Sequence, residues 1–244
     1  MDLRYYESYR KLQDEHWWFQ ARSKILEELI AAWGLAPEHG EILDIGCGPG
    51  GPLLQRLSRR YRVEGLDAEP AAVAIAHQQG LANVRVGTLD SLTESDGGKD
   101  LALLLDVIEH VEQDVQMLNA ARRVLRPGGC LLVTVPALPW LWSGHDRLAH
   151  HYRRYRQSEL KTKLETAGWV CERITFFNTL LFPLAAVKKL ADRFRKGSEQ
   201  HGYYDTPGKI LNGFFRAVFA SEARWLKNHT FLVGVSLLAV GRKH

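Results

Sequence analysis

Apolar and polar positions along the first 136 residues change period repeatedly from helix to strand and back. Residues 1–34 predict a helix that ends at Gly34, because large apolar side chains recur on one face: Trp18, Ile25, Leu26, Leu29 and Ile30. Short apolar runs predict strands at 41–45, 62–67, 83–86, 100–105 and 130–135, and the segments between them predict helices at about 51–60, 70–79 and 114–125. This alternation is typical of a parallel sheet with helices on both faces.

The regular alternation of short strands and helices ends after residue 136. We expect a helix at 158–167, a strand at 170–176, two helical segments at about 179–194 and 208–227, and a last strand at 231–241. The chain therefore predicts a single α/β domain over 1–244 with a Rossmann-like doubly wound sheet. Its parts are a helical cap at 1–36, a core at 37–176 and 229–244, and a late helical insertion at 177–228.

The composition fits such a domain, since 45% of the 244 residues are hydrophobic. The longest apolar stretches, 179–187 and 231–241, are shorter than the roughly 18–20 residues that span a bilayer, and the polar N-terminus lacks the apolar region of a secretory signal. Three widely spaced cysteines, Cys47, Cys130 and Cys171, predict small core residues in a reducing compartment. We therefore expect a cytoplasmic protein with neither a disulfide framework nor a metal site.

A glycine-rich segment, DIGCGPGG at 44–51, lies where the first predicted strand turns into a helix. Glycine lets the backbone approach a ligand closely and adopt positive φ without steric cost. Gly46, Gly48 and Gly51 also fit the dinucleotide-binding pattern GxGxxG, and Asp67 follows about 20 residues later, as a ribose ligand should. The glycines alone therefore do not identify the ligand, and a plain strand–helix turn also remains open.

Acidic side chains accompany the glycines. Asp44 stands two residues before the first glycine, where it could hold an ammonium group, and Asp90 follows the third strand, where it could meet an adenine amino group. Asp106 follows strand 100–105 at the carboxyl edge, where open α/β sheets bind ligands. A cationic sulfonium ligand suits this acidic rim and a pyrophosphate does not, so the residues favour S-adenosylmethionine as cofactor, with Asp106 among its contacts.

Four features together resemble the class I S-adenosylmethionine-dependent methyltransferases: EILDIGCGPG at 41–50, Asp67, LLLDVIEHVEQD at 103–114 and RVLRPGGCLLVTVP at 123–136. The resemblance covers roughly residues 40–136. It implies a seven-stranded sheet whose last strand, 231–241, runs antiparallel. It also implies methyl transfer from S-adenosylmethionine and contacts to that cofactor from Asp44, Gly46, Gly48, Asp67 and Asp90.

A narrower resemblance to a bacterial subgroup of these enzymes rests on four further motifs: HWWFQAR at 16–22, LPWLWSGHD at 138–146, HYRRYR at 151–156 and VGVSLLAVGRK at 233–243. This resemblance supports the predicted fold, but it says little about the substrate. The polar stretch 197–208 matches none of the shared motifs.

Candidate acceptor-binding residues lie outside the predicted sheet. On the N-terminal helix we expect Trp17 and Trp18 to contact the acceptor and Arg22 the cofactor carboxylate, although the tryptophans could instead fix the helix to the sheet. The further aromatic candidates are Trp142, Tyr152 and Tyr155, which would line an apolar slot. The catalytic candidates are His145, His151, Arg153 and Arg154, because histidine exchanges protons near neutral pH and arginine holds anions in bidentate fashion.

The insertion combines large apolar side chains with a cationic run. The apolar residues are Leu180, Leu181, Phe182, Leu184, Phe214, Phe215, Val218, Phe219 and Trp225. Residues 188–196 hold five Lys or Arg and one Asp, in a chain of net charge +4. The apolar groups either pack on the sheet, line an acceptor pocket or lie on an anionic membrane surface. Segment 179–227 is therefore a candidate for peripheral contact with the inner face of the membrane.

These features favour methyl transfer to a small-molecule acceptor, apolar or lipid-like, with a hydroxyl or an anionic group. A hydroxyl must lose a proton, which His145 or His151 could accept, whereas Arg153 and Arg154 would orient an anion that needs no base. The alternatives are a polar metabolite or protein as acceptor, a non-catalytic cofactor-binding module and an NAD-dependent dehydrogenase. No nucleic-acid partner is expected, because no basic stripe crosses the core.

Overall fold

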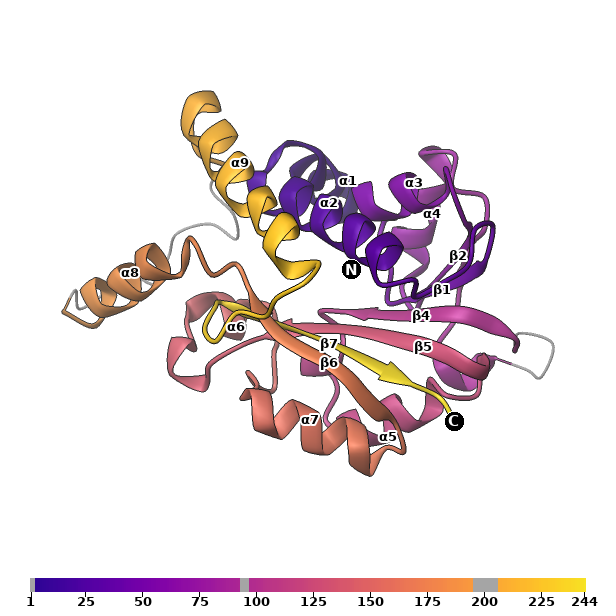
Figure 1. Cartoon of the computed structure of the whole chain (residues 1–244). Coiled ribbons are helices and arrows are strands. Elements are labelled where there is room, and N and C mark those ends of the chain that lie inside the picture. Colours follow the sequence, from indigo (N-terminus) through magenta and orange to yellow (C-terminus); the bar gives the residue numbers. More distant parts are fainter. Residues whose placement is uncertain (1–2, 93–96, 195–205) are drawn as a thin grey trace.

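The computed structural model describes residues 3–92, 97–194 and 206–244, and the side chains of 192–194 lie outside the described part. At its centre is a seven-stranded sheet in the order β3-β2-β1-β4-β5-β7-β6, in which β7 alone runs antiparallel to its neighbours (Figure 1). The strands are β1 Glu41–Ile45, β2 Arg62–Asp67, β3 Val84–Val86, β4 Lys99–Leu105, β5 Leu125–Pro136, β6 Val170–Phe177 and β7 Ser236–Arg242. The predicted doubly wound sheet and its antiparallel last strand are confirmed.

Helices cover both faces of this sheet (Figure 1). One face carries α2 Trp17–Ala32, α3 Pro52–Leu57, α4 Pro70–Gln78 and α9 Lys209–Leu226, with α1 Leu3–Glu15 against α4. The other face carries α5 Asp114–Ala120 and α7 Gln157–Thr166, while α6 Gly144–Leu148 follows β5 and α8 Phe182–Phe194 projects from the body. Short 3₁₀ turns are η1 Leu89–Ser91, η3 Ile108–His110 and η4 Pro139–Leu141. None of the described helices combines the length and apolarity needed to cross a membrane.

Each face of the sheet has its own apolar core. In β4, Leu101 and Leu103 belong to the core beneath α2 and α9, and Ala102 and Leu104 belong to the core beneath α5 and α7. Successive side chains of a strand point to opposite faces, so a central strand must be apolar throughout to supply both cores. This is why the short, uniformly apolar runs of the sequence predict the sheet correctly.

The predicted single helix over 1–34 was wrong. The segment forms two helices that meet at His16, whose extended backbone and ring cap the start of α2 by accepting a hydrogen bond from the Trp18 amide at 3.2 Å. The break turns α1 back across the glycine-rich loop, where the side chain of Gln13 lies against Gly51. The segment 1–34, for which the sequence predicts one continuous helix, therefore folds back and covers the glycine-rich loop.

Two strand boundaries also differ from the prediction. The strand predicted at 130–135 begins earlier, at Leu125, and its first residues are irregular because the register against β4 shifts there. The last strand begins at Ser236 instead of Phe231, which makes only an isolated bridge to Phe176. Both differences lie at strand ends, where local sequence carries little information about pairing.

Candidate active site

Polar side chains meet at the carboxyl ends of the central strands. Asp44 lies in β1, Asp67 ends β2, Asp106 follows β4 and Thr134 lies in β5. The Thr134 hydroxyl donates to the Asp106 carboxylate at 3.1 Å, and Asp106 itself adopts a left-handed backbone with φ 58°. Asp tolerates that conformation better than most residues, although such strain often accompanies functional sites. This edge is where open α/β sheets bind their ligands.

The glycine-rich loop is fixed to this edge by Asp67. Its carboxylate accepts hydrogen bonds from the Gly48 amide at 2.7 Å and from the Glu69 amide at 2.9 Å. Gly46 has φ +74°, and a Cβ there would lie 2.7 Å from a methyl group of Val107, so only glycine fits. A carboxylate has about four acceptor positions, and Asp67 therefore retains capacity for the hydroxyl groups of a ribose.

Asp44 is buried beside the loop, with 5% of its surface exposed. Burial raises the pKa of its carboxyl to about 7, the nearby Arg22 guanidinium opposes that rise, and Asp67 adds to it. A second positive charge in this place would favour the ionised carboxylate. The ammonium group of an amino-acid ligand would supply that charge, as the sequence predicts for Asp44.

Arg22 reaches the same edge from α2. Its guanidinium pairs with Asp106 at 2.8 Å, donates to the Thr134 hydroxyl at 2.8 Å and lies 5.1 Å from the centre of the Trp18 ring. The structure thus brings Arg22 and Trp18 to the carboxyl edge. Trp17 instead packs on α9 against Phe215 and Phe219, away from that edge. In the structure Trp17 joins α2 to α9, and its contact with the acceptor stays a prediction.

A pocket of about 530 Å³ opens next to this edge. Its lining residues are His110, Trp142, Arg147, His150, His151 and Tyr152. Three sequence candidates, Trp142, His151 and Tyr152, therefore share one cavity. The ring of His145 lies 6.0 Å from that of His151, and burial lowers the pKa of His145. A neutral imidazole at neutral pH can accept a proton, which keeps His145 a candidate base.

Two residues of the HYRRYR motif point away from the pocket. The Tyr155 side chain is fully buried and donates to the Asp114 carboxylate at 2.9 Å, while Arg153 pairs with the same carboxylate at 2.9 Å and with the Glu112 carbonyl. The motif runs in an extended segment, so residues two apart share a side. Both side chains thus contact Asp114 of α5, while the acceptor contact of Tyr155 and the catalytic role of Arg153 stay predictions.

Arg154 also has a different place from the one predicted. Its guanidinium donates to the Asp146 carboxylate at 2.8 Å and to the Ala137 carbonyl at 3.1 Å. Asp146 in turn hydrogen-bonds the ring of His151 at 3.0 Å. In the structure the Arg154 guanidinium holds Asp146, the partner of a pocket histidine, and the direct contact of Arg154 with an anionic acceptor stays a prediction.

Asp90 lies in η1, after β3, with 93% of its side chain exposed and Arg123 at 3.5 Å. Its position after the third strand is the one on which the adenine prediction rests. That contact stays a prediction, because the exposed carboxylate is not held against the glycine-rich loop by any hydrogen bond that involves the described residues.

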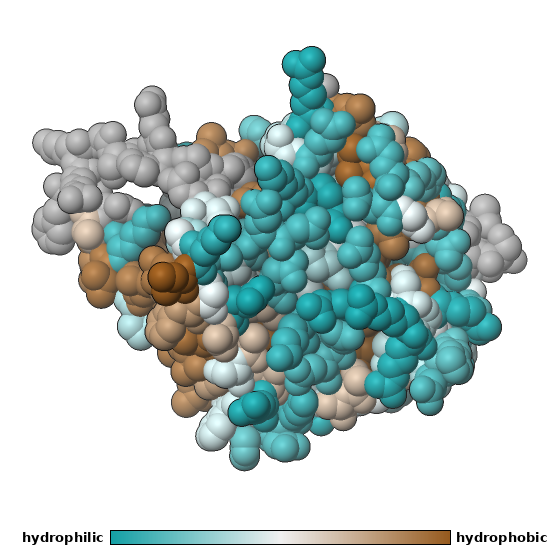
Figure 2. Space-filling model, turned by 90° about the horizontal axis from the view of Figure 1, so that it is seen from above, coloured by the Kyte–Doolittle hydropathy of each residue, from teal (hydrophilic) through white to brown (hydrophobic). Residues whose placement is uncertain are grey.

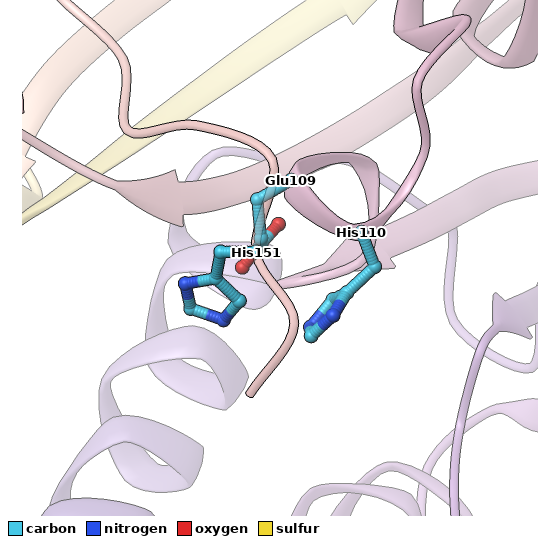
Figure 3. Close-up of side chains that lie close together, drawn as sticks. All are labelled: Glu109, His110 and His151. Atoms are coloured by element: carbon cyan, nitrogen blue, oxygen red, sulfur yellow. The ribbon is translucent and has the colours of Figure 1, made fainter. Parts of the chain in front are cut away.

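Sequence reasoning missed Glu109 and His110. They form η3 immediately after β4, and the ring centres of His110 and His151 lie 4.6 Å apart (Figure 3). Glu109 is completely buried, and this burial, with the Asp106 charge, raises the pKa of its carboxyl well above the usual range. The sequence offered one indication of their role. Both lie in the segment 103–114, shortly after a strand that is buried on both faces.

The comparisons with known proteins decide the family. The model of a family described as "Methyltransferase domain" matches residues 17–174. The chain belongs to this family. Its cofactor is S-adenosylmethionine, as the sequence predicts, and the buried Asp44 and the loop-bound Asp67 suit the ammonium and ribose groups of that molecule.

Relatives carry the same chemistry. A probable S-adenosylmethionine-dependent methyltransferase of Mycolicibacterium smegmatis is 33% identical over 166 residues, which are 66% of this chain and 62% of that protein. A ubiquinone biosynthesis O-methyltransferase of Cereibacter sphaeroides is 37% identical over 97 residues, 37% of this chain and 39% of its own length. The match to each therefore spans less than two thirds of the relative's length.

Solved structures agree on the fold. A TehB-like S-adenosylmethionine-dependent methyltransferase from Corynebacterium glutamicum superposes with a TM-score of 0.57 at 20% identity, covering 99% of this chain and 97% of the other. At that identity the likeness concerns the fold alone. The reaction of this methyltransferase has to be argued from its own site.

Proposed function

We propose that this methyltransferase transfers the methyl group of S-adenosylmethionine to an apolar, lipid-like small molecule that carries a hydroxyl or anionic group. The observation that carries the proposal is the continuity between the pocket and an exposed apolar surface on α8. Trp142 lines the pocket, and its backbone carbonyl accepts a hydrogen bond from Lys189 of α8. The ring of Trp140 lies 6.1 Å from that of Phe182 at the beginning of α8.

The apolar surface is large for one region of a protein surface. Its exposed residues in α8, α9 and the adjoining turn are Leu180, Leu184, Val187, Leu190, Ile210, Leu211 and Phe214. Figure 2 shows hydrophobic side chains gathered on the left of the molecule, where α8 lies. Exposed apolar side chains that gather in one region of a surface mark an interaction surface for a ligand, a membrane or a protein. An apolar acceptor that enters from this side would reach the pocket at Trp142.

The relatives support the reaction class. One of them is a ubiquinone biosynthesis O-methyltransferase, and O-methylation is the reaction that a hydroxyl acceptor would undergo here. The proton of such a hydroxyl has a nearby base in His145, whose pKa is lowered by burial.

The residues of this chain would act mainly by positioning. Asp44 and Asp67 hold the amino-acid and ribose parts of the cofactor, while Trp142 and Tyr152 hold the acceptor and exclude water. Alignment of two reactants in this way lowers a barrier by as much as roughly 7–11 kcal/mol. The acceptor oxygen attacks the methyl carbon as the bond from carbon to sulfur breaks, and S-adenosylhomocysteine leaves as a neutral thioether.

Peripheral membrane contact through 179–227 belongs to the same proposal. The helix α8 presents Leu184, Val187 and Leu190 to solvent beside Lys188 and Lys189, which is the arrangement of a helix that lies in a membrane interface. The other cations of the run, from residue 193 on, lie outside the described side chains. Such contact would place the enzyme at the surface where lipid-like acceptors are concentrated.

The experiment is a partition of methyl label. The protein is incubated with S-adenosylmethionine labelled in its methyl group and with bacterial membrane lipid extract, and the label is divided between organic, aqueous and protein fractions. Label in the organic phase that depends on the protein supports the proposal. Label confined to the aqueous phase or to protein points to a polar metabolite or a protein as acceptor, and no transfer to any fraction favours a non-catalytic module.

A further inference from the structure

Within the described residues, a group of three side chains has the spacing of a metal site. Each of Glu109, His110 and His151 offers one ligand atom, and these atoms all lie within 4.8 Å of one another. Figure 3 shows Glu109 and His110 projecting from the turn after β4 and His151 from the segment after α6, with the Glu109 carboxylate beside the His151 ring. Ligand atoms at about 2.1 Å from a tetrahedral ion stand roughly 3.4 Å apart, so the three side chains would have to close by up to about 1.5 Å to hold it.

The Glu109 carboxylate is the strongest sign that a cation belongs here. Its side chain has no exposed surface, and neither carboxylate oxygen has a hydrogen-bond partner on another described residue, its own backbone amide being the one nearby donor. A buried carboxylate without a partner costs several kcal/mol, and native structures avoid this cost through hydrogen bonds, ion pairs or metal coordination. One carboxylate oxygen of Glu109 lies within 4.8 Å of a ring nitrogen of each of the two histidines.

The two imidazoles are held in orientations that metal ligands commonly have. The Nδ1 atom of His151 hydrogen-bonds Asp146 at 3.0 Å, which leaves Nε2 for a metal. Asp146 is fixed in turn by Arg154 and by the amide and hydroxyl of Ser143. The His110 ring donates a hydrogen bond to the Ala149 backbone. A carboxylate or carbonyl behind each ligating histidine sets the tautomer and strengthens the metal bond.

We infer that Glu109, His110 and His151 bind one divalent transition-metal ion of the zinc type, with an open coordination position toward the pocket. Two imidazoles and one carboxylate are a ligand set of catalytic zinc sites, and nitrogen ligands favour such ions over Mg²⁺ or Ca²⁺. His110 and His151 also line the pocket, so the fourth position faces the space proposed for the acceptor. The sequence predicted no metal site, because it does not reveal that residue 151 returns to the turn after β4.

The ion gives the pocket a chemical role, and this step rests on the proposed function. A hydroxyl acceptor bound to the open position would lose its proton to water more readily, as metal-bound water does. The resulting oxyanion attacks the methyl carbon, the new bond joins oxygen and carbon, and the electron pair of the broken bond remains on sulfur. The ion therefore selects hydroxyl acceptors and fixes the attacking oxygen.

The test measures metal binding without any acceptor. Tag-free protein stripped with a chelator is titrated calorimetrically with Zn²⁺, and Co²⁺ is used as a visible-absorption probe of the coordination. We expect one equivalent to bind, at least tenfold weaker binding in Glu109→Gln and His151→Ala, and about 10–100-fold weaker binding in the positioning variant Asp146→Asn. Glu109→Gln removes an unpaired buried charge and should fold at least as well as the natural chain. His244→Ala, which removes an exposed imidazole at the C-terminus, should bind like the natural chain.

A thermal shift gives a second reading, since an ion that binds only the folded state raises the melting temperature. Zn²⁺ should raise it for the natural chain and for His244→Ala but not for Glu109→Gln. The inference is overturned if no stoichiometric binding occurs, or if Glu109→Gln and His151→Ala bind Zn²⁺ as tightly as the natural chain. Metal binding with no label in the organic fraction would instead overturn the lipid-like acceptor and leave the metal site standing.

Discussion

Asp114 illustrates how one side chain organises the wall of the site. Its carboxylate is almost fully buried and accepts hydrogen bonds from Tyr155, Lys163 and Arg153 at 2.9 Å each. Burial alone raises its pKa, but the hydrogen bonds from Lys163 and Tyr155 and the two cationic charges outweigh this and leave the pKa below its usual value. A depressed pKa in the folded state means that the ionised group stabilises the fold above its unfolded pKa, and that this stability is lost as the pH falls through the folded pKa.

We therefore predict that Asp114→Asn lowers the free energy of unfolding by about 3 kcal/mol at neutral pH, because it breaks a buried ionic network. The difference between the two proteins should shrink as the pH falls from about 4, the usual pKa of an unfolded Asp, through the lower folded pKa of Asp114. Urea unfolding at neutral pH and near pH 3 measures both values. An equal difference at the two pH values would contradict this account of Asp114.

Arg153 provides a contrast with the pocket residues. Since its guanidinium pairs with Asp114 and is partly exposed, Arg153→Ala should lower the free energy of unfolding by about 1 kcal/mol and leave turnover of the folded enzyme within about twofold.

Trp142→Ala, which removes a wall of the pocket, should raise KM for the acceptor without loss of cofactor affinity. Steady-state kinetics and urea unfolding on both variants separate the roles. A large loss of kcat in a stable Arg153→Ala enzyme would restore the catalytic role for Arg153.

The residue scale also shows where sequence reasoning stops. The positions of Asp44 and Gly46 could be predicted because they belong to one local strand–turn–helix unit, and Asp67 because it ends the next strand, which pairs with the first. The HYRRYR motif could not be divided into pocket and anchor residues, because that depends on which side of an extended segment faces α5. Glu109 was overlooked since its unpaired burial becomes visible only when β4, α6 and the motif are assembled.

At the scale of elements, α8 is the least integrated helix of the described chain. It projects from the body, and its contacts include the hydrogen bond from Lys189 to the Trp142 carbonyl and the ring contact between Phe182 and Trp140 (Figure 1). Leu184 and Val187 are both more than half exposed. A helix that leaves such side chains in water gains stability when an apolar surface covers them.

The corresponding prediction concerns Leu184→Glu combined with Val187→Glu. The double variant should bind anionic phospholipid vesicles at least about tenfold more weakly, because two apolar contacts are replaced by charges that the lipid repels. S-adenosylmethionine affinity should not change. Val170→Glu, an exposed apolar position at the beginning of β6, serves as control in the same vesicle sedimentation assay. Equal vesicle binding by all three proteins would exclude α8 as the membrane contact.

On the scale of the whole molecule, the sheet could be predicted and the arrangement around it could not. Strands buried on both faces leave a simple apolar signature, and the alternation with helices fixes a doubly wound order. The break at His16 and the packing of α9 on α2 depend on contacts such as that of Trp17 with Phe219, which join residues about two hundred positions apart. Such long-range packing overrides the local pattern. The positions of the cap and the insertion on the sheet therefore could not be predicted from the sequence.

The central claim is that the acidic carboxyl edge binds S-adenosylmethionine through the glycine-rich loop and Asp67. Calorimetric titration with S-adenosylmethionine and separately with NAD tests it most directly, using the natural chain, Asp67→Ala and the exposed-acid control Glu38→Ala. Hydrogen bonds to a charged group contribute about 1.5–3 kcal/mol each, so Asp67→Ala should bind S-adenosylmethionine at least about tenfold more weakly. The natural chain and Glu38→Ala should bind it alike, and NAD should not bind. Unchanged affinity in Asp67→Ala, or preference for NAD, would contradict the account.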